Sequence, residues 1–316
     1  MRLFVDAWEP GYGTGIDPAD DRPGQRSSAA LDVNVELPAE EWRPLNPPPG
    51  MSSPDVVHVV DGVRRVDARV WLDSAYQTYP GLAASYAAGV VRCDLRGGVA
   101  ELAAAHVERG LFTPAPDAVQ VGMPPARYDP QHVSRGEPSD LVLGVQAQLR
   151  SLEVRVSTAV ARLEELLIVD GPLRGRAHLP NALGYVKTHQ TQYLPDRLGA
   201  VVTGLRPGQR SPIFKLGTSW HRYTWYLRLP GPAGSAWSGI VRVEAAAELP
   251  VQAVVELADM SAVTLPRFAS SPYKDARAPQ NLVPIAGLEK RLRALLGDAR
   301  VLHRALVRAA AAGAPA

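Results

Sequence analysis

The sequence predicts an α/β protein with a mixed sheet, flanking helices and an extended N-terminal arm. Three features support this prediction: alternating apolar residues before residue 100, an amphipathic stretch near residue 150, and a short apolar run directly after it. The alternating runs suit antiparallel strands, and the apolar run suits a buried parallel strand. Together they predict an α/β order of elements with mixed strand direction.

Composition excludes several classes of protein. The 316 residues are 46% hydrophobic and 21% charged, which is typical of a globular protein and argues against wholesale disorder. No run of about 18 uncharged apolar residues is present, so we expect no membrane-spanning segment. The first residues lack the apolar core of a signal peptide, and we therefore expect a cytoplasmic protein. A single cysteine, Cys93, excludes an internal disulfide and a cysteine-based zinc site.

The N-terminal residues differ in charge from the rest of the chain. Residues 1–61 carry 11 acidic and 4 basic side chains, whereas the remaining residues carry 21 and 30. A basic body is compatible with a nucleic-acid partner, but a GC-rich genome explains the dominance of arginine over lysine better. Residues 1–50 are rich in proline, glycine and acids, and we predict an extended arm with one short strand over 31–37.

Strands are expected next. Residues 55–61 form the first strong strand pattern, and residues 63–72 form a second alternating run. An Asp-Gly pair between two such runs is the strongest short-range signal of a hairpin, so we predict a turn at Asp61. A third strand is predicted over 83–93. The alanines of residues 100–111 favour a helix, although a fourth strand is the alternative.

A helix and a buried strand follow a predicted loop over 113–138. Ser139 is a helix-capping residue, and apolar side chains recur at helical spacing up to residue 163, which predicts a helix over 140–165. The next residues, 166–171, read Leu-Leu-Ile-Val-Asp-Gly and are typical of a buried parallel strand.

The C-terminal part is predicted to contain a strand pair and two helices. The strands cover 224–229 and 239–244, with a proline- and glycine-rich turn between them. A helix over 284–296 is stopped by Gly297, and a second helix runs to about residue 311.

Three carboxylates are candidates for chemistry. Asp61 and Asp170 each close a buried strand and are followed by glycine; a single such pair is more readily a turn, but two favour a site at the edge of the sheet. Glu153 lies at the border of the predicted helix's apolar stripe, where a carboxylate is costly unless it is bonded, binds a cation or reaches past the rim to water. Carboxylates from two strands and an adjoining helix suit Mg²⁺ or Mn²⁺ and phosphoryl transfer.

Six segments then carry a family resemblance by their joint order. They are Val59-Val-Asp-Gly-Val-Arg-Arg-Val-Asp-Ala-Arg69, Leu167-Ile-Val-Asp-Gly-Pro-Leu173, Gly184-Tyr-Val-Lys-Thr188, Trp225-Tyr-Leu-Arg-Leu229, Gly239-Ile-Val-Arg-Val-Glu244 and Asp275-Ala-Arg-Ala-Pro-Gln-Asn-Leu-Val-Pro-Ile285. In this order they resemble the NurA nuclease family, in its bacterial branch. The resemblance covers about residues 51–297, so the arm (1–50) and a final helix and tail (298–316) lie outside it.

The resemblance implies an RNase H-like fold and a Mn²⁺-dependent DNA nuclease with exonuclease and single-strand endonuclease activity. It also implies a homodimer and a HerA-type hexameric translocase as partner in DNA end processing and double-strand break repair. The alternative is a non-catalytic RNase H-like subunit that binds DNA and the translocase without cutting. The final helix, with Leu302, Leu306 and the basic Arg300, Arg304 and Arg308, is a second possible contact face for a partner.

The resemblance also assigns site residues. It places the catalytic, metal-binding carboxylates on Asp61, Glu153 and Asp170. The family's tyrosine and histidine pair falls on Tyr273 and Asn281. Asparagine offers an amide oxygen but neither a base nor a strong nitrogen ligand, so Asp275 is a rival for the last metal ligand.

Basic residues near these positions are candidates for binding DNA. Arg64 and Arg65 directly follow the first aspartate, although strand alternation directs only one of them toward the site. Lys187 could contact the scissile phosphate, and a solvated lysine is the alternative. With Tyr273, Arg277 completes the predicted DNA-binding set.

Overall fold

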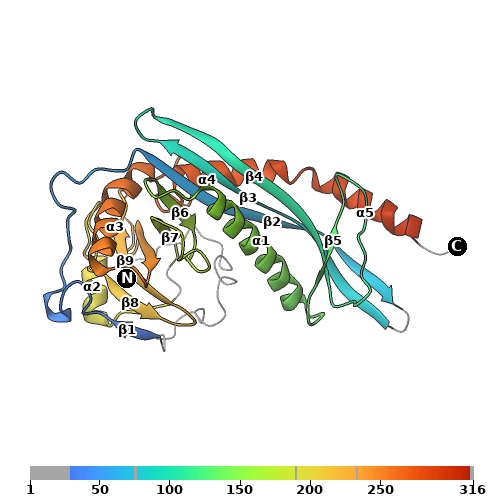
Figure 1. The fold of residues 1–316 in the computed structure, drawn as a ribbon, viewed down its shortest axis with the longest axis horizontal. Coiled ribbons are helices and arrows are strands. Elements are labelled where there is room, and N and C mark those ends of the chain that lie inside the picture. The colour runs from blue at the N-terminus through green and yellow to red at the C-terminus, as the bar shows by residue number, and fades with distance from the viewer. Residues whose placement is uncertain (1–28, 75–76, 189–190, 233, 314–316) are drawn as a thin grey trace. The chain divides into compact units, whose positions relative to one another are not determined.

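A computed structural model describes residues 29–74, 77–188, 191–232 and 234–313 (Figure 1). The described chain is a mixed α/β structure and divides into two compact units. The first comprises the residues up to 60 together with 91–101 and 157–286, and the second comprises 61–90, 102–156 and 287–316. No helix among the described residues is long and apolar enough to cross a membrane.

The first unit is built on a mixed sheet. Its strands are hydrogen-bonded in the order β1 (Ala30–Asp32), β8 (Phe214–Gly217), β9 (His221–Arg228), β10 (Ile240–Ala246), β7 (Ala182–Val186), β6 (Leu166–Asp170) and β2 (Val56–Ser74). Strands β2, β6 and β7 are parallel, whereas β10 runs antiparallel to β7 and β9. This confirms the predicted mixed sheet with flanking helices.

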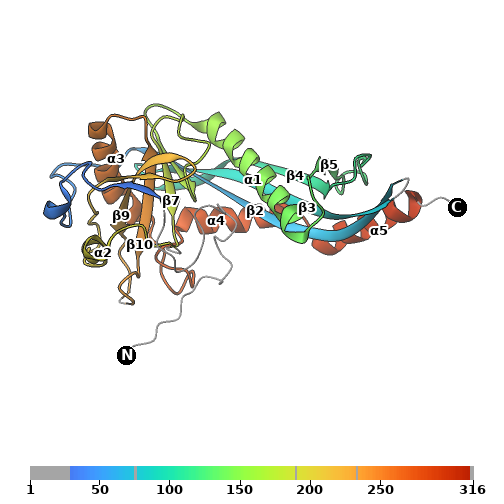
Figure 2. The same ribbon diagram turned by 90° about the horizontal axis from the view of Figure 1, so that it is seen from below.

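Helices cover both faces of this sheet, α3 (Val251–Thr264) on one and α2 (Asp196–Thr203) on the other (Figure 2). Trp225 lies in the core on the α3 side, and its neighbour Tyr226 lies in the core on the α2 side, since successive strand residues face opposite ways. Val57, Val59, Ile168 and Tyr185 belong to the α3-side core.

The described part of the N-terminal arm packs on the first unit. β1 pairs antiparallel with β8, although it is shorter than the strand predicted over 31–37. Trp42, which follows a short 3₁₀ helix (Ala39–Glu41), is buried, with its ring centroid 5.9 Å from that of Phe214. Residues 1–28 of the predicted arm lie outside the described residues. The predicted domain boundaries, 1–50, 51–297 and 298–316, stay predictions.

The second unit contains three long strands. β2 is followed by β3 (Gln77–Asp94) and β4 (Val99–Thr113), which neighbour one another in that order, and the short β5 (Asp129–His132) pairs parallel with β4. Because the connections between β2, β3 and β4 are only a few residues long, these strands are antiparallel.

Helices complete the second unit. They are α1 (Pro138–Val160), α5 (Ala299–Gly313) and the last turns of α4 (Val283–Leu295). Leu302 and Leu306 of α5 are buried in a core with Ala83, Leu111 and Tyr128. The proposed contact face on these two leucines is therefore wrong, because they pack within the unit.

The hairpin predicted at Asp61 is wrong. β2 continues through Asp61 and Gly62 as one strand of 19 residues. A Cβ atom at position 62 would lie 2.5 Å from Glu153 Oε1 and 2.7 Å from Leu149 Cδ1. Glycine leaves room here for these two side chains of α1, and no turn is formed.

The other predicted elements were partly confirmed by the structure. The segment over 100–111 is the strand β4 rather than the favoured helix, and the helix predicted to residue 165 ends at Val160. The strand pair β9 and β10, the helices α4 and α5 and the third strand are observed where they were expected. α2, α3, β8 and a 3₁₀ turn (Leu265–Phe268) after α3 were not predicted. The loop predicted over 113–138 contains the short strand β5, which pairs with β4.

Candidate metal centre

Strand register brings Asp61 and Asp170 to the same level of the sheet. Val60 pairs with Val169, so the two aspartates are the next residues on adjacent parallel strands. Val59 and Ile168, two residues earlier on each strand, both lie in the α3-side core. Since alternate residues share a face, both aspartates project on that side.

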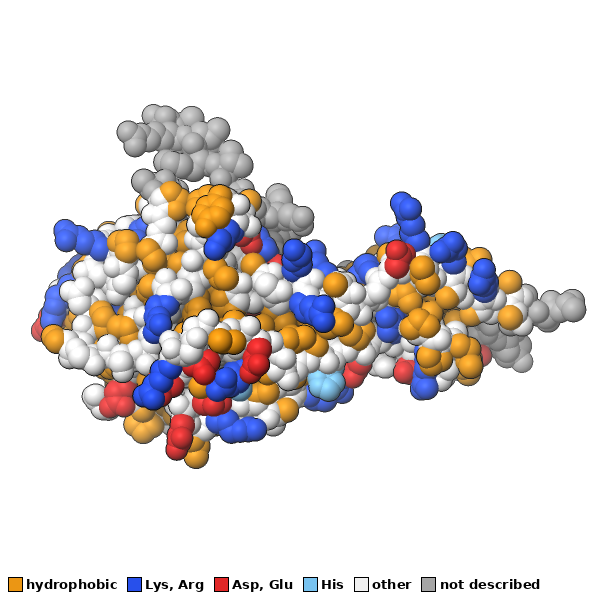
Figure 3. All heavy atoms as spheres, turned by 90° about the horizontal axis from the view of Figure 1, so that it is seen from above, with side chains coloured by type: hydrophobic (Ala, Val, Ile, Leu, Met, Phe, Trp, Pro, Cys, Tyr) orange, Lys and Arg blue, Asp and Glu red, His pale blue; other side chains and the backbone are white. Residues whose placement is uncertain are grey.

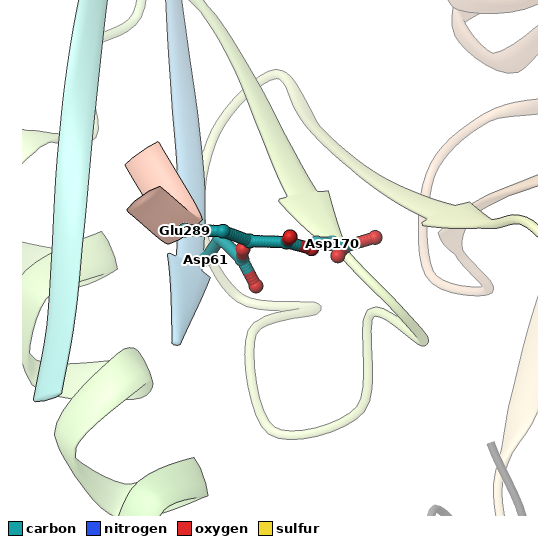
Figure 4. Close-up of side chains that lie close together, drawn as sticks. All are labelled: Asp61, Asp170 and Glu289. Carbon is teal, nitrogen blue, oxygen red and sulfur yellow. The ribbon is translucent and has the colours of Figure 1, made fainter. Parts of the chain in front are cut away.

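Glu289 of α4 joins the two aspartates to form an acidic cluster (Asp61, Asp170 and Glu289). Each side chain offers one carboxylate oxygen, and the three oxygens lie within 4.8 Å of one another (Figure 4). Asp61 and Glu289 are buried, and Asp170 is partly buried. Glu289 lies one helical turn after Ile285, which is buried in the α3-side core.

The cluster fits a divalent cation. Like charges at this separation repel one another unless a proton or cation intervenes, and carboxylate oxygens are the ligands that Mg²⁺ and Mn²⁺ prefer. Asp170 Oδ1 is buried and accepts no hydrogen bond from the residues that the structure describes. A buried carboxylate oxygen without a donor is unfavourable, and coordination of a cation would compensate it.

The other oxygen of Asp170 is bound by Lys187. Lys187 directly follows β7 and is 4% exposed, so the solvated-lysine interpretation is wrong. Its Nζ donates to Asp170 Oδ2 at 2.6 Å and to Asn281 Oδ1 at 3.0 Å. The lysine therefore holds the second aspartate of the cluster on one side.

Asn281 and Asp275 extend the chain of hydrogen bonds that begins at Lys187. Asn281 is fully buried, and its Nδ2 donates to Asp275 Oδ2 at 2.7 Å. Arg277 donates to both oxygens of Asp275, through its backbone N and Nε to Oδ1 and through Nη2 to Oδ2. Burial alone would raise the pKa of Asp275, but the hydrogen bonds from Arg277 and Asn281 outweigh it and lower this pKa to about 2. We call these five residues the Lys187 network: Asp170, Lys187, Asn281, Asp275 and Arg277.

Glu153 is not a member of the acidic cluster. Its Oε1 lies where a side chain at position 62 would project, and residue 62 faces the opposite side of β2 from Asp61. The structure therefore brings Asp61 and Asp170 together, and the third carboxylate of the cluster comes from Glu289. Glu289 sits among Ile285, Leu288 and Leu292 at helical spacing, so its sequence carried the same signal of a carboxylate beside an apolar stripe.

The predicted DNA-binding residues differ in accessibility. Arg65 donates from Nε to Asp67 Oδ1 at 2.8 Å and from Nη1 to the Gly297 carbonyl at 2.8 Å. Arg277 is engaged with Asp275, as described above. Arg64 is exposed, and Tyr273 is 83% exposed. Of the predicted DNA-binding residues, Arg64 and Tyr273 are therefore the exposed ones, and neither takes part in the Lys187 network or in the contact with Asp67.

Comparison with known proteins gives little. No protein-family model matches the chain, and no curated protein matches it. Among solved structures, endonuclease V from Bacillus subtilis is similar to this chain, with 10% sequence identity and a TM-score of 0.31. The match covers 79% of this chain and 82% of the endonuclease chain. At this TM-score the likeness carries no weight for function, and the resemblance to the NurA family stays a prediction.

Proposed function

We propose that this protein is a divalent-metal-dependent nuclease that hydrolyses DNA phosphodiesters. The acidic cluster supports this proposal most directly, because three carboxylate oxygens within 4.8 Å include one from Asp170, whose Oδ1 is buried without a hydrogen-bond donor among the described residues. A bound Mn²⁺ or Mg²⁺ would supply positive charge against a phosphodiester and activate water for attack. The preference for Mn²⁺ comes from the NurA resemblance.

The chain's own residues then have distinct roles. Asp61, Asp170 and Glu289 would hold the cation, and Lys187 would occupy the second oxygen of Asp170. Glu153, which approaches β2 beside Gly62, stays a proposed catalytic ligand from the family resemblance.

Arg64 and Tyr273 are the exposed members of the predicted DNA-binding set, but Arg64 lies on the face of β2 opposite to Asp61. On the face shown in Figure 3, basic side chains are dispersed among acidic and apolar ones and form no single stripe. We expect substrate binding to depend on the cation and on local contacts near the cluster.

The biological setting rests on the resemblance alone. A HerA-type translocase partner, a homodimer, a cytoplasmic location and a role in DNA end processing and double-strand break repair are proposals on that ground. The rival, a non-catalytic DNA- and translocase-binding subunit, is supported by the asparagine at position 281 in place of the family's histidine.

Cleavage of labelled single-stranded and duplex DNA, with Mn²⁺, Mg²⁺ or EDTA, separates these proposals. We expect Asp61→Asn and Asp170→Asn to lower cleavage by a factor on the order of 100 or more, because each removes a charge that would hold the cation. Glu256→Gln is the matched control, since Glu256 is exposed on α3.

Two further variants in the same assay identify the third ligand. Glu289→Gln should abolish cleavage if the cluster is the site, whereas Glu153→Gln should do so if the family assignment holds. Wild-type protein that binds DNA but cuts neither substrate with either metal would support the non-catalytic rival.

A further inference from the structure

The Lys187 network gives Asn281 a role different from the ligand role that the resemblance assigns. We infer that Asn281 is a positioning residue, which holds the Lys187 ammonium against one oxygen of Asp170 and leaves the other oxygen for a cation. This inference rests on the proposed metal-dependent function. All five residues of the network belong to the first compact unit.

Both polar atoms of the Asn281 side chain are already engaged. Its Oδ1 accepts from Lys187 Nζ at 3.0 Å, and its Nδ2 donates to Asp275 Oδ2 at 2.7 Å. The opposite amide orientation would turn an NH₂ group toward an ammonium and an oxygen toward a carboxylate, so the two charged neighbours fix the orientation. A cation at Asn281 Oδ1 would have to compete with the lysine for this oxygen.

The backbone around Asn281 is fastened to the end of β7. Tyr185 Oη donates to the Gln280 carbonyl at 2.6 Å, and Gln280 Nε2 donates to the Lys187 carbonyl at 3.2 Å. The Asn281 backbone N donates to the Arg277 carbonyl at 3.0 Å. The asparagine and the lysine are thus held at a fixed separation by hydrogen bonds on both sides.

This arrangement determines which carboxylate oxygen of Asp170 is left for a cation. Lys187 Nζ contacts Oδ2 at 2.6 Å, while Oδ1 is the buried oxygen without a donor among the described residues. Because Asn281 shares the ammonium, the lysine stays on the Oδ2 side. Without Asn281, the ammonium would lose one acceptor and would bind Asp170 more fully, in competition with a cation.

A double-mutant cycle on Mn²⁺ affinity tests this inference. The probe is Mn²⁺ alone, and free Mn²⁺ is measured by electron paramagnetic resonance on the full chain. We expect Asn281→Leu to weaken Mn²⁺ binding about 10-fold, as is typical when a residue that orients a ligand is removed. Lys187→Met should not weaken it, because a competing positive charge is removed.

The double variant decides between the two roles. If Asn281 acts through Lys187, Asn281→Leu changes nothing in the Lys187→Met background. If Asn281 is itself a ligand, the double variant binds Mn²⁺ about 10-fold more weakly than Lys187→Met, and the inference is overturned. Unchanged affinity in Asn281→Leu alone would overturn it as well.

Controls separate this inference from folding and from the proposed function. If circular dichroism shows that Asn281→Leu does not fold, Asn281→Ser replaces it, since its short hydroxyl cannot bridge Lys187 and Asp275. Wild-type protein that binds no Mn²⁺ overturns the proposed function together with this inference. Wild-type protein that binds Mn²⁺ with additive effects of the two substitutions overturns this inference alone.

Discussion

Glu244 shows how individual residues hold the loop that follows the acidic cluster. It is fully buried in β10, and its Oε1 accepts from Arg222 Nε at 2.8 Å and from Arg242 Nη2 at 2.9 Å. Its Oε2 accepts from the Leu173 backbone N at 3.1 Å, three residues after Asp170. One carboxylate thus neutralises two buried arginines and fixes the chain that leaves β6.

We expect Glu244→Gln to lower the free energy of unfolding by about 3–5 kcal/mol, because it leaves two buried guanidinium groups with a neutral partner. Urea unfolding followed by circular dichroism measures this change. Glu256→Gln, at an exposed position of α3, is the control and should stay within about 0.5 kcal/mol of wild type. A loss below 1 kcal/mol in Glu244→Gln would contradict the anchoring role.

At the scale of elements, two glycines illustrate how a helix meets its surroundings. Gly62 lies in β2, where an added Cβ would meet the ends of the Glu153 and Leu149 side chains of α1 at 2.5 and 2.7 Å. Gly287 lies on the exposed side of α4, and an added Cβ there would meet nothing within 4 Å. A side chain at the first position would displace side chains of α1, whereas one at the second would displace nothing.

Alanine should therefore have opposite effects at these two positions. Gly62→Ala is expected to destabilise the protein by about 1 kcal/mol, since the Glu153 and Leu149 side chains must move to accept the methyl group. Gly287→Ala is expected to stabilise it by about 0.5–1 kcal/mol, because alanine is the better helix former. Paired thermal and urea unfolding of the two variants checks both signs. Stabilisation by Gly62→Ala would show that the side chains of α1 leave enough room for a methyl group at position 62.

The same elements show which parts of the fold the sequence can predict. Apolar patterns located the first and third strands, the buried strand β6 and the long helix, because the helix buries one stripe of side chains and β6 is a continuous apolar run buried on both faces. They failed where tertiary contacts outweigh local preference. The alanines of residues 100–111 favour a helix in isolation, but they form a strand because β4 pairs with β3.

The two Asp-Gly pairs have the same sequence but different structures, which local sequence patterns cannot distinguish. At position 171 the glycine has φ of 93°, a conformation that favours glycine, and the strand ends there. At position 62 the same dipeptide lies within a continuous strand, and the glycine leaves room for the Glu153 and Leu149 side chains of α1. Two of the three clustered carboxylates were predicted from the strands. The third, Glu289, is about 120 residues further along than Asp170, and only the fold brings it near.

For the molecule as a whole, charge buried at the acidic cluster links stability to cation binding. Three carboxylates within 4.8 Å repel one another when no cation is bound. Any ligand that binds only the folded protein adds stability in proportion to the logarithm of its concentration. Stability of the whole chain should therefore report on the cluster even without a substrate.

We expect Mn²⁺ at 100 times its Kd to stabilise wild-type protein by about 2.7 kcal/mol. Asp61→Asn should abolish this gain and should raise the melting temperature of the metal-free protein, because one of the repelling charges is removed. Differential scanning fluorimetry with Mn²⁺ and with EDTA measures both effects, and Glu256→Gln again serves as the control. An equal Mn²⁺ response in Asp61→Asn and wild type would place the cation elsewhere.

The unbroken course of β2 sets where the chain can change in length. Asp61 reaches the cluster only because its register with β6 is fixed by the four pairs from Val57 to Val60. One residue inserted between these positions would turn the aspartate to the opposite face. The turn at residues 95–98 between β3 and β4 carries no such restriction, because its last three residues are exposed. Insertions and deletions among relatives, and tags or loops added by engineering, should therefore accumulate at such turns and be absent from residues 57–61.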